Sequence, residues 1–97
     1  MELETIKADL SILQNKLATK ITKLDCYLFG SILTNVKQAN DIDILIIYEN
    51  QEILDIVKKE FRALSADNPF HINYFTYAEE KELNFITQQK AKKIFGL

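Results

Sequence analysis

The amino-acid sequence predicts a small α/β (α+β) domain in which helices pack on a mixed β-sheet of three to four strands. Segments with helical apolar spacing alternate along the chain with short β-branched or aromatic runs, which is the order of a layered α/β fold. The 97 residues are 47% hydrophobic and 27% charged, which suits one folded core. No repeat or linker divides the chain, so we expect residues 1–97 to form a single domain.

The first helix is predicted within the first twenty-four residues, where no glycine or proline interrupts the chain. Apolar residues recur there at spacings of three and four, which places them on one helical face. We expect one long amphipathic helix whose apolar face belongs to the core; the alternative is that part of this face meets a partner protein. The apolar positions are Leu3, Ile6, Leu10, Leu13, Leu17 and Ile21.

The segment that follows predicts two strands joined by a short helix. "CYLFG" at 26–30 is short, rich in aromatic residues and ends in glycine, which is typical of a buried strand. "SILTNVKQ" at 31–38 predicts a short helix that Ser31 caps. "DIDILIIY" at 41–48 is almost continuously apolar and β-branched, so we expect a central strand covered on both faces.

The second half of the chain repeats this alternation. Apolar residues at helical spacing predict a helix over 50–66, which must stop before Pro69 because a residue that precedes proline resists the α conformation. The alternating segment 70–76 predicts a strand. A further helix is expected at 77–89, and a short edge strand at 92–97 completes the chain.

Composition excludes several classes of protein. The net charge of −2 gives no overall basic field for nucleic acid, and no window of eighteen apolar residues predicts a membrane span. A secretory signal begins with a basic region followed by an apolar region, and the N-terminus shows no such pattern. The single cysteine, Cys26, cannot form an internal disulfide, and we expect a small buried side chain in a reducing compartment. We therefore expect a cytoplasmic protein without a membrane partner.

Two carboxylates open the most apolar strand. Residues two apart on a strand project to the same side, so Asp41 and Asp43 are predicted to lie together. Such a pair repels itself unless a cation lies between the two groups, and carboxylate oxygens suit Mg²⁺ or Mn²⁺. The alternative is that Asp41 ends a turn while Asp43 lies at the solvated start of the strand.

Gly30 and Ser31 form a second group of candidate binding residues, and they lie shortly before the two aspartates in the sequence. A strand that ends in glycine and is followed by serine lets backbone N–H groups and a hydroxyl approach a phosphate closely. Taken alone, Ser31 needs no role beyond that of a helix cap. The combination of this corner with Asp41 and Asp43 on the next strand indicates metal-assisted nucleotide chemistry.

The stretch "FGSILTNVKQANDIDILI" resembles the signature of the DNA-polymerase-beta-like nucleotidyltransferase superfamily. The short chain is similar to the minimal nucleotidyltransferases, and the resemblance covers most of it. It implies a nucleoside triphosphate, most readily ATP, bound as a magnesium complex. Gly30 and Ser31 would hold the triphosphate, Asp41 and Asp43 the metal ions, and a nucleotidyl group such as AMP would pass to a hydroxyl.

The resemblance also implies partners. Some minimal nucleotidyltransferases work with a separately encoded helical protein, as antitoxin and toxin, and modify that protein. A nucleic-acid acceptor and a homodimer are compatible with the resemblance, but nothing in the sequence points to either of them.

The sequence departs from the family pattern at the third carboxylate. Active members carry an acid on the following strand, and Asn73 stands at that position here. An amide oxygen can coordinate a cation but cannot accept a proton as a base. The chain is therefore either an enzyme that uses Asn73 as a third ligand or a degenerate member that acts as a binding or regulatory module. His71 is a candidate substitute base; the alternative is a strand histidine with a partly exposed ring.

Basic residues are scarce near the motif. Many members of the family place an arginine or lysine soon after Gly-Ser, but the first basic residue after Ser31 is Lys37, which is expected either to reach the phosphates or to be an ordinary surface lysine. The run "KAKK" at 90–93 can contact polyphosphate or nucleic acid, or it can simply be solvated.

Overall fold

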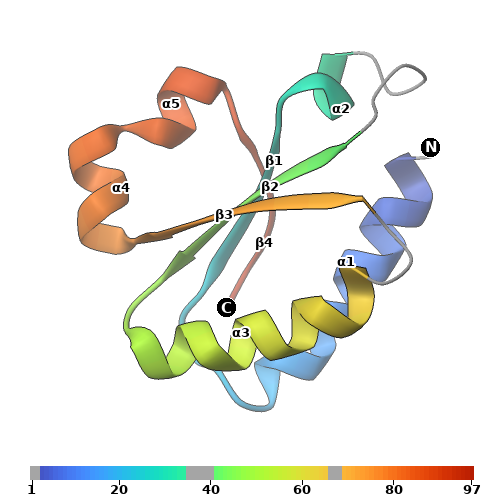
Figure 1. Cartoon of the computed structure of the whole chain (residues 1–97), viewed down its shortest axis with the longest axis vertical. Coiled ribbons are helices and arrows are strands. Elements are labelled where there is room, and N and C mark those ends of the chain that lie inside the picture. The colour runs from blue at the N-terminus through green and yellow to red at the C-terminus, as the bar shows by residue number, and fades with distance from the viewer. Residues whose placement is uncertain (1–2, 35–40, 66–68) are drawn as a thin grey trace.

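The chain folds around a four-stranded mixed sheet with the order β3-β2-β1-β4 (Figure 1). The computed structural model describes residues 3–34, 41–65 and 69–97. Strand β2 runs parallel to β3, and β1 runs antiparallel to both β2 and β4. The predicted fold class is confirmed. The elements are α1 (Leu3–Ala18), β1 (Asp25–Phe29), α2 (Ser31–Thr34), β2 (Ile42–Tyr48), α3 (Gln51–Ser65), β3 (Phe70–Thr76), α4 (Tyr77–Leu83), α5 (Phe85–Gln89) and β4 (Lys92–Gly96).

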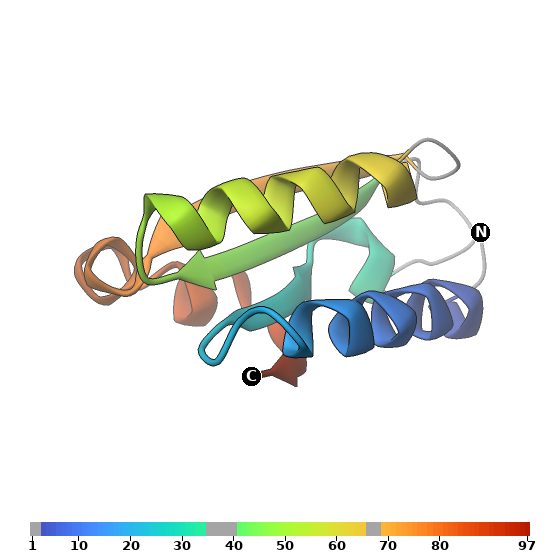
Figure 2. The same cartoon turned by 90° about the horizontal axis from the view of Figure 1, so that it is seen from below.

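Helices α1 and α3 run side by side and cover one face of the sheet (Figures 1 and 2). The apolar stripe predicted for the first helix is buried there from Ile6 to Leu17, and Phe61 of α3 packs into the same core. β2 is a central strand buried on both faces, as its sequence predicts. The buried members of the α1 stripe are Ile6, Leu10, Leu13 and Leu17.

The opposite face of the sheet is covered over only part of its length, by α4 and α5. The ring of Phe85 packs edge-to-face on Phe29 and Phe75, with ring centres 5.0 and 5.2 Å apart, respectively. These rings close over Leu45 and Ile47, which form the second apolar cluster with Phe29. The aromatic contacts anchor α5 to one part of this face and leave the polar side chains near the start of β2 outside the cluster.

The first helix is shorter than the sequence predicts. α1 ends at Ala18, and the expectation of one helix through the first twenty-four residues is wrong. The hydroxyl of Thr19 donates a hydrogen bond to the Lys16 carbonyl at 2.8 Å, a local bond that competes with continued helix. Ile21 is nevertheless 3% exposed, so the apolar spacing identified a core residue that lies beyond the helix.

The helix expected at 77–89 is divided into α4 and α5 at Asn84. Asn84 has φ 54° and ψ 39°, a left-handed conformation that asparagine tolerates better than most residues. The Glu80 carboxylate accepts a hydrogen bond from the Ile86 N–H at 3.2 Å and so stabilises the start of the second helix. The break redirects the chain so that Phe85 reaches the sheet.

The other predicted boundaries are close to those observed. The strand expected at 70–76 is confirmed, and the final edge strand forms at 92–96. α2 occupies the first four residues of the helix expected at 31–38, and residues 35–38 lie outside the described residues. None of the helices in the described part of the chain combines the length and apolar content that crossing a bilayer requires.

Because Cys26 is buried, we expect the domain to lose stability as the pH rises. Its side chain is fully buried in β1, and burial raises the pKa of the thiol far above its ordinary value, with the nearby Asp25 carboxylate adding to the effect. The thiol's contribution to stability is therefore complete below the unfolded-state pKa of about 8.5 and is lost as the pH rises above it, by about 1.4 kcal/mol per pH unit. Denaturant melts between pH 7 and 9.5, compared with those of Cys26→Ala, measure this difference. Equal pH slopes for the two proteins would contradict it.

Candidate functional site

The candidate site lies where the end of β1 meets the starts of β2 and β3. Phe29 of β1 is in register with Asp43, and Asp43 is in register with His71 on β3. Asp43 therefore occupies the middle of three neighbouring strands. It shares a sheet face with Leu45 and Ile47 but lies beyond the apolar cluster that they form.

Asp43 and His71 are in direct contact. His71 Nδ1 lies 3.2 Å from Asp43 Oδ1, and the two side chains are 69% and 22% exposed, respectively. The imidazole is thus largely solvated, as the plainer interpretation of His71 expects, but it also fixes one oxygen of the Asp43 carboxylate. This contact follows from the parallel register of β2 and β3, which sets the two side chains on the same face.

Gly30 lies directly against the second oxygen of the same carboxylate. A Cβ atom added to Gly30 would approach Asp43 Oδ2 to 2.3 Å, and the backbone there has φ +80°. Any other residue would both strain the backbone and displace the carboxylate. Ser31 begins α2 and is exposed. The phosphate-binding corner predicted from the sequence therefore adjoins one of the two predicted metal ligands.

The other predicted site residues that the structure describes are not brought into contact with Asp43 or Gly30 in the same way. Asp41 is exposed and immediately precedes β2. Asn73 is half-buried and in register with Leu45, so the residue opposite Asp43 is His71 and not Asn73. Within the described ranges, no group of three or more His, Cys, Asp or Glu side chains is placed to hold a metal ion. Lys37 lies outside the described residues.

The donor atoms at this site fit a hard divalent cation. Asp43 is mostly buried, and its Oδ2 lies in a space that only glycine at position 30 leaves open. Asp41, two residues earlier, brings a second carboxylate to the same end of the strand. Mg²⁺ is commonly held by one or two protein carboxylates together with substrate phosphates, so this pair suits Mg²⁺ or Mn²⁺ when phosphate is present.

The structure also has a cavity beside Gly30 that the sequence did not predict. It has a volume of about 350 Å³ and is lined by Gly30, Leu33, Gln89, Lys90 and Lys92. The basic run at 90–93 was visible in the sequence, but its position beside Gly30 depends on the pairing of β1 with β4. Its cationic lining distinguishes this cavity from the other side of Gly30, where Asp43 lies.

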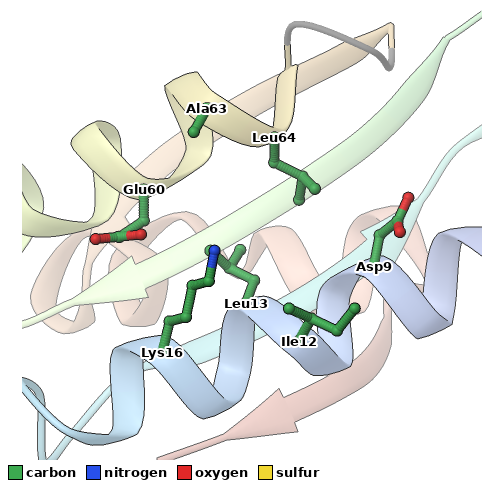
Figure 3. A pocket seen from close by; sticks show the side chains of 7 residues that line it. All are labelled: Asp9, Ile12, Leu13, Lys16, Glu60, Ala63 and Leu64. Carbon is green, nitrogen blue, oxygen red and sulfur yellow. The ribbon is translucent and has the colours of Figure 1, made fainter.

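The groove between α1 and α3 is the contrasting case (Figure 3). Its volume is about 120 Å³, and it shares Ile12, Lys16 and Glu60 with an adjoining hollow of about 650 Å³. The groove contains no residue of the Gly-Ser or Asp-x-Asp motif. It does not belong to the candidate site. Its lining residues are Asp9, Ile12, Leu13, Lys16, Glu60, Ala63 and Leu64.

The chain matches the sequence model of a known protein family. The sequence model of a protein family described as "Nucleotidyltransferase domain" matches residues 10–95 of the chain. The matched region contains β1, β2 and β3 and hence all the site residues described above. No curated protein matches the chain.

Proposed function

Because this chain belongs to the nucleotidyltransferase domain family, we propose that it binds a nucleoside triphosphate, most readily ATP, and transfers its nucleotidyl group to a hydroxyl acceptor. Membership of the family supports nucleotidyl transfer in general terms. The identity of the nucleotide, of the metal and of the acceptor belongs to the proposal. The observation that supports it most is the close approach of Gly30 to the Asp43 carboxylate, since it brings a proposed phosphate-binding residue against a proposed metal ligand.

In this proposal, Asp41 and Asp43 hold Mg²⁺ or Mn²⁺, and Gly30 and Ser31 hold the triphosphate. The metal, when bound, supplies positive charge that stabilises the charge developing on the phosphates. His71 orients Asp43 through the 3.2 Å contact, and Gly30 leaves room for the Asp43 carboxylate because it carries no side chain. A bond forms between the acceptor oxygen and the α-phosphorus, the bond to pyrophosphate breaks, and the hydroxyl proton passes to solvent.

A second candidate function is favoured by Asn73. This half-buried amide lies opposite Leu45 and brings neither a negative charge nor a base to the site. General-base contributions are typically about 10²–10⁴-fold in rate, so a member without that group can retain binding while turnover falls below detection. The chain would then act as a nucleotide- or partner-binding regulatory module.

We further propose a cytoplasmic protein whose acceptor is a separately encoded helical partner protein, in the manner of a toxin–antitoxin pair. The resemblance of this short chain to minimal nucleotidyltransferases supports the proposal, and the net charge of −2 gives no general affinity for a nucleic-acid acceptor. A homodimer is compatible with it.

The experiment is a transfer assay with α-³²P-labelled ATP, Mg²⁺ or Mn²⁺, and the proteins encoded beside this gene as acceptors. Wild type is compared with Asp43→Ala and Asn73→Asp, and with Asp55→Ala as a matched control on the exposed side of α3. Thermal melts with and without ATP-Mg²⁺ measure binding separately from transfer.

We expect wild type and Asp55→Ala to label an acceptor, and Asp43→Ala to label none. If wild type is stabilised by ATP-Mg²⁺ and labels nothing while Asn73→Asp does, the regulatory module is the correct function. A melting temperature that ATP-Mg²⁺ leaves unchanged, together with the absence of label, would refute both.

A further inference from the structure

The described part of the motif lacks a cation for the phosphates. No lysine or arginine occurs between Gly30 and Thr34, and the chain as a whole carries a net charge of −2. A triphosphate brings several negative charges close to Asp43, so an anion at this corner needs basic side chains from elsewhere in the fold. The structure supplies two of them from the last segment of the chain, Lys90 and Lys92.

Lys92 lies on β4, on the other side of β1 from the strand that carries Asp43, and Lys90 lies at the end of α5 just before it. β1 lies between β2 and β4 in the sheet, with Phe29 in register with Asp43 and Leu28 in register with Lys92. Consecutive strand residues project to opposite faces, so Lys92 extends from the face of the sheet opposite to that of Asp43, and a phosphate chain that contacts both must pass around the end of β1 at Gly30. The described residues that line the cavity of about 350 Å³ beside Gly30 include no acidic side chain.

Lys90 holds an unfavourable backbone conformation at this cavity. It has φ 52° and ψ 41° at the end of α5, where its N–H bonds to the carbonyls of Ile86 and Thr87. Left-handed helix ends are usually taken by glycine or asparagine, because a Cβ atom is disfavoured there. Lysine is therefore an unusual residue in this position, and its side chain lines the cavity beside Gly30.

The charges of these lysines are not neutralised within the described ranges. The ion pairs found there involve neither Lys90 nor Lys92, and the same is true of Lys7, which lines the adjoining hollow with Lys92. Lys93 differs, since its ammonium lies 2.9 Å from the Asp25 carboxylate. An uncompensated cluster of ammonium groups beside a glycine corner suits a polyphosphate.

We propose that Lys90 and Lys92 bind the terminal phosphates of the nucleoside triphosphate, on the opposite side of Gly30 from Asp43. The assignment rests on the proposed function for the identity of the ligand. The two lysines supply positive charge that residues 31–34, directly after Gly30, do not carry, and they also hold the pyrophosphate product until it leaves.

Calorimetric titration with inorganic tripolyphosphate, ATP and AMP, each with Mg²⁺, tests the assignment. The variants are Lys90→Gly, Lys92→Gln and their combination, and the matched control is Lys59→Gln with Lys81→Gln, which removes the same charge from exposed positions on α3 and α4. Each site variant is expected to weaken tripolyphosphate and ATP about tenfold or more, since hydrogen bonds to charged groups are strong. AMP, which lacks the terminal phosphates, is expected to bind all variants equally.

Lys90→Gly gives a second readout. Glycine adopts φ 52° without strain, so this variant is expected to melt at a higher temperature than wild type while it binds tripolyphosphate more weakly. Destabilisation therefore cannot explain its loss of affinity.

Different results would refute the lysine assignment and the transferase proposal. Wild-type levels of tripolyphosphate binding in the double variant, or no binding by wild type, would overturn the lysine assignment. If lysine-dependent binding is found without transfer of label from ATP, the assignment stands and the transferase proposal is wrong. If label is transferred with the same KM for ATP in Lys90→Gly and Lys92→Gln, the transferase proposal stands and the assignment is wrong.

Discussion

Replacement of Gly30 by alanine is expected to slow nucleotidyl transfer about 10²-fold or more and to destabilise the domain at the same time. The added Cβ would lie 2.3 Å from Asp43 Oδ2 and 3.2 Å from Asp43 Cγ, so the carboxylate must move. Misplacement of a reacting group by about 1 Å can reduce a rate about 10²-fold. The φ of +80° adds about 1–2 kcal/mol of backbone strain. Transfer assays and denaturant melts of Gly30→Ala measure the two effects.

Gly96→Ala is the matched control for this prediction. A Cβ atom at Gly96 would also crowd a carboxylate, since Asp25 Oδ1 would lie 2.8 Å away, but the other near atoms belong to the end of the Lys93 side chain and the backbone φ is not positive. These groups can rotate away, so we expect a change in stability within about 1 kcal/mol and unaltered ATP binding. If the two alanine variants lose transfer equally, close contact with Asp43 is not the cause.

The parts of the site that the sequence predicts are the parts that depend on short stretches of chain. Gly30 and Asp43 lie within one strand–helix–strand unit, and the family signature covers both. The family match over residues 10–95 confirms the resemblance on which the site was predicted. The contact between them is a consequence of β1 and β2 pairing antiparallel, with Phe29 opposite Asp43.

The contacts that the sequence does not predict depend on the register between distant strands. Asn73 and His71 are two residues apart on β3 and share a face, so the sequence does not show which of them lies beside Asp43. The parallel register selects His71 and places Asn73 opposite Leu45. The same limit applies to Lys92, whose position near Gly30 follows from the pairing of β4 with β1.

The two helices whose lengths were predicted wrongly end for local reasons that the spacing of apolar residues does not reveal. Ile21 fits the apolar stripe of the first helix and is buried, yet Thr19 bonds to the Lys16 carbonyl and α1 has already ended. At the other break, Asn84 takes a left-handed conformation within a segment of otherwise helical composition. In both places a polar side chain or backbone preference decides the boundary, while the apolar residue that follows is still directed to the core.

Phe61→Ala is expected to have the largest effect on stability, and it connects the core to the site. Phe61 is 1% exposed on α3, and its ring packs edge-to-face on Phe70 with centres 6.1 Å apart. Truncation of a buried phenylalanine costs about 3–5 kcal/mol, a large share of the roughly 5–15 kcal/mol that stabilises a domain. Phe70 is the first residue of β3 and precedes His71, so the loss of its partner also loosens the strand that holds His71 against Asp43.

Two further variants separate the loss of packing from the removal of any apolar side chain. Phe61→Leu keeps most of the volume, so it is expected to cost much less than Phe61→Ala and to preserve ATP binding. Ile12→Ala removes a side chain that is 58% exposed on α1 and is expected to change stability by no more than about 0.5 kcal/mol. Urea melts give the free energies of unfolding, and titration with ATP-Mg²⁺ below the melting temperature reports on the site. If Phe61→Ala melts like Ile12→Ala, the face of the sheet covered by α1 and α3 is not the core that positions β3.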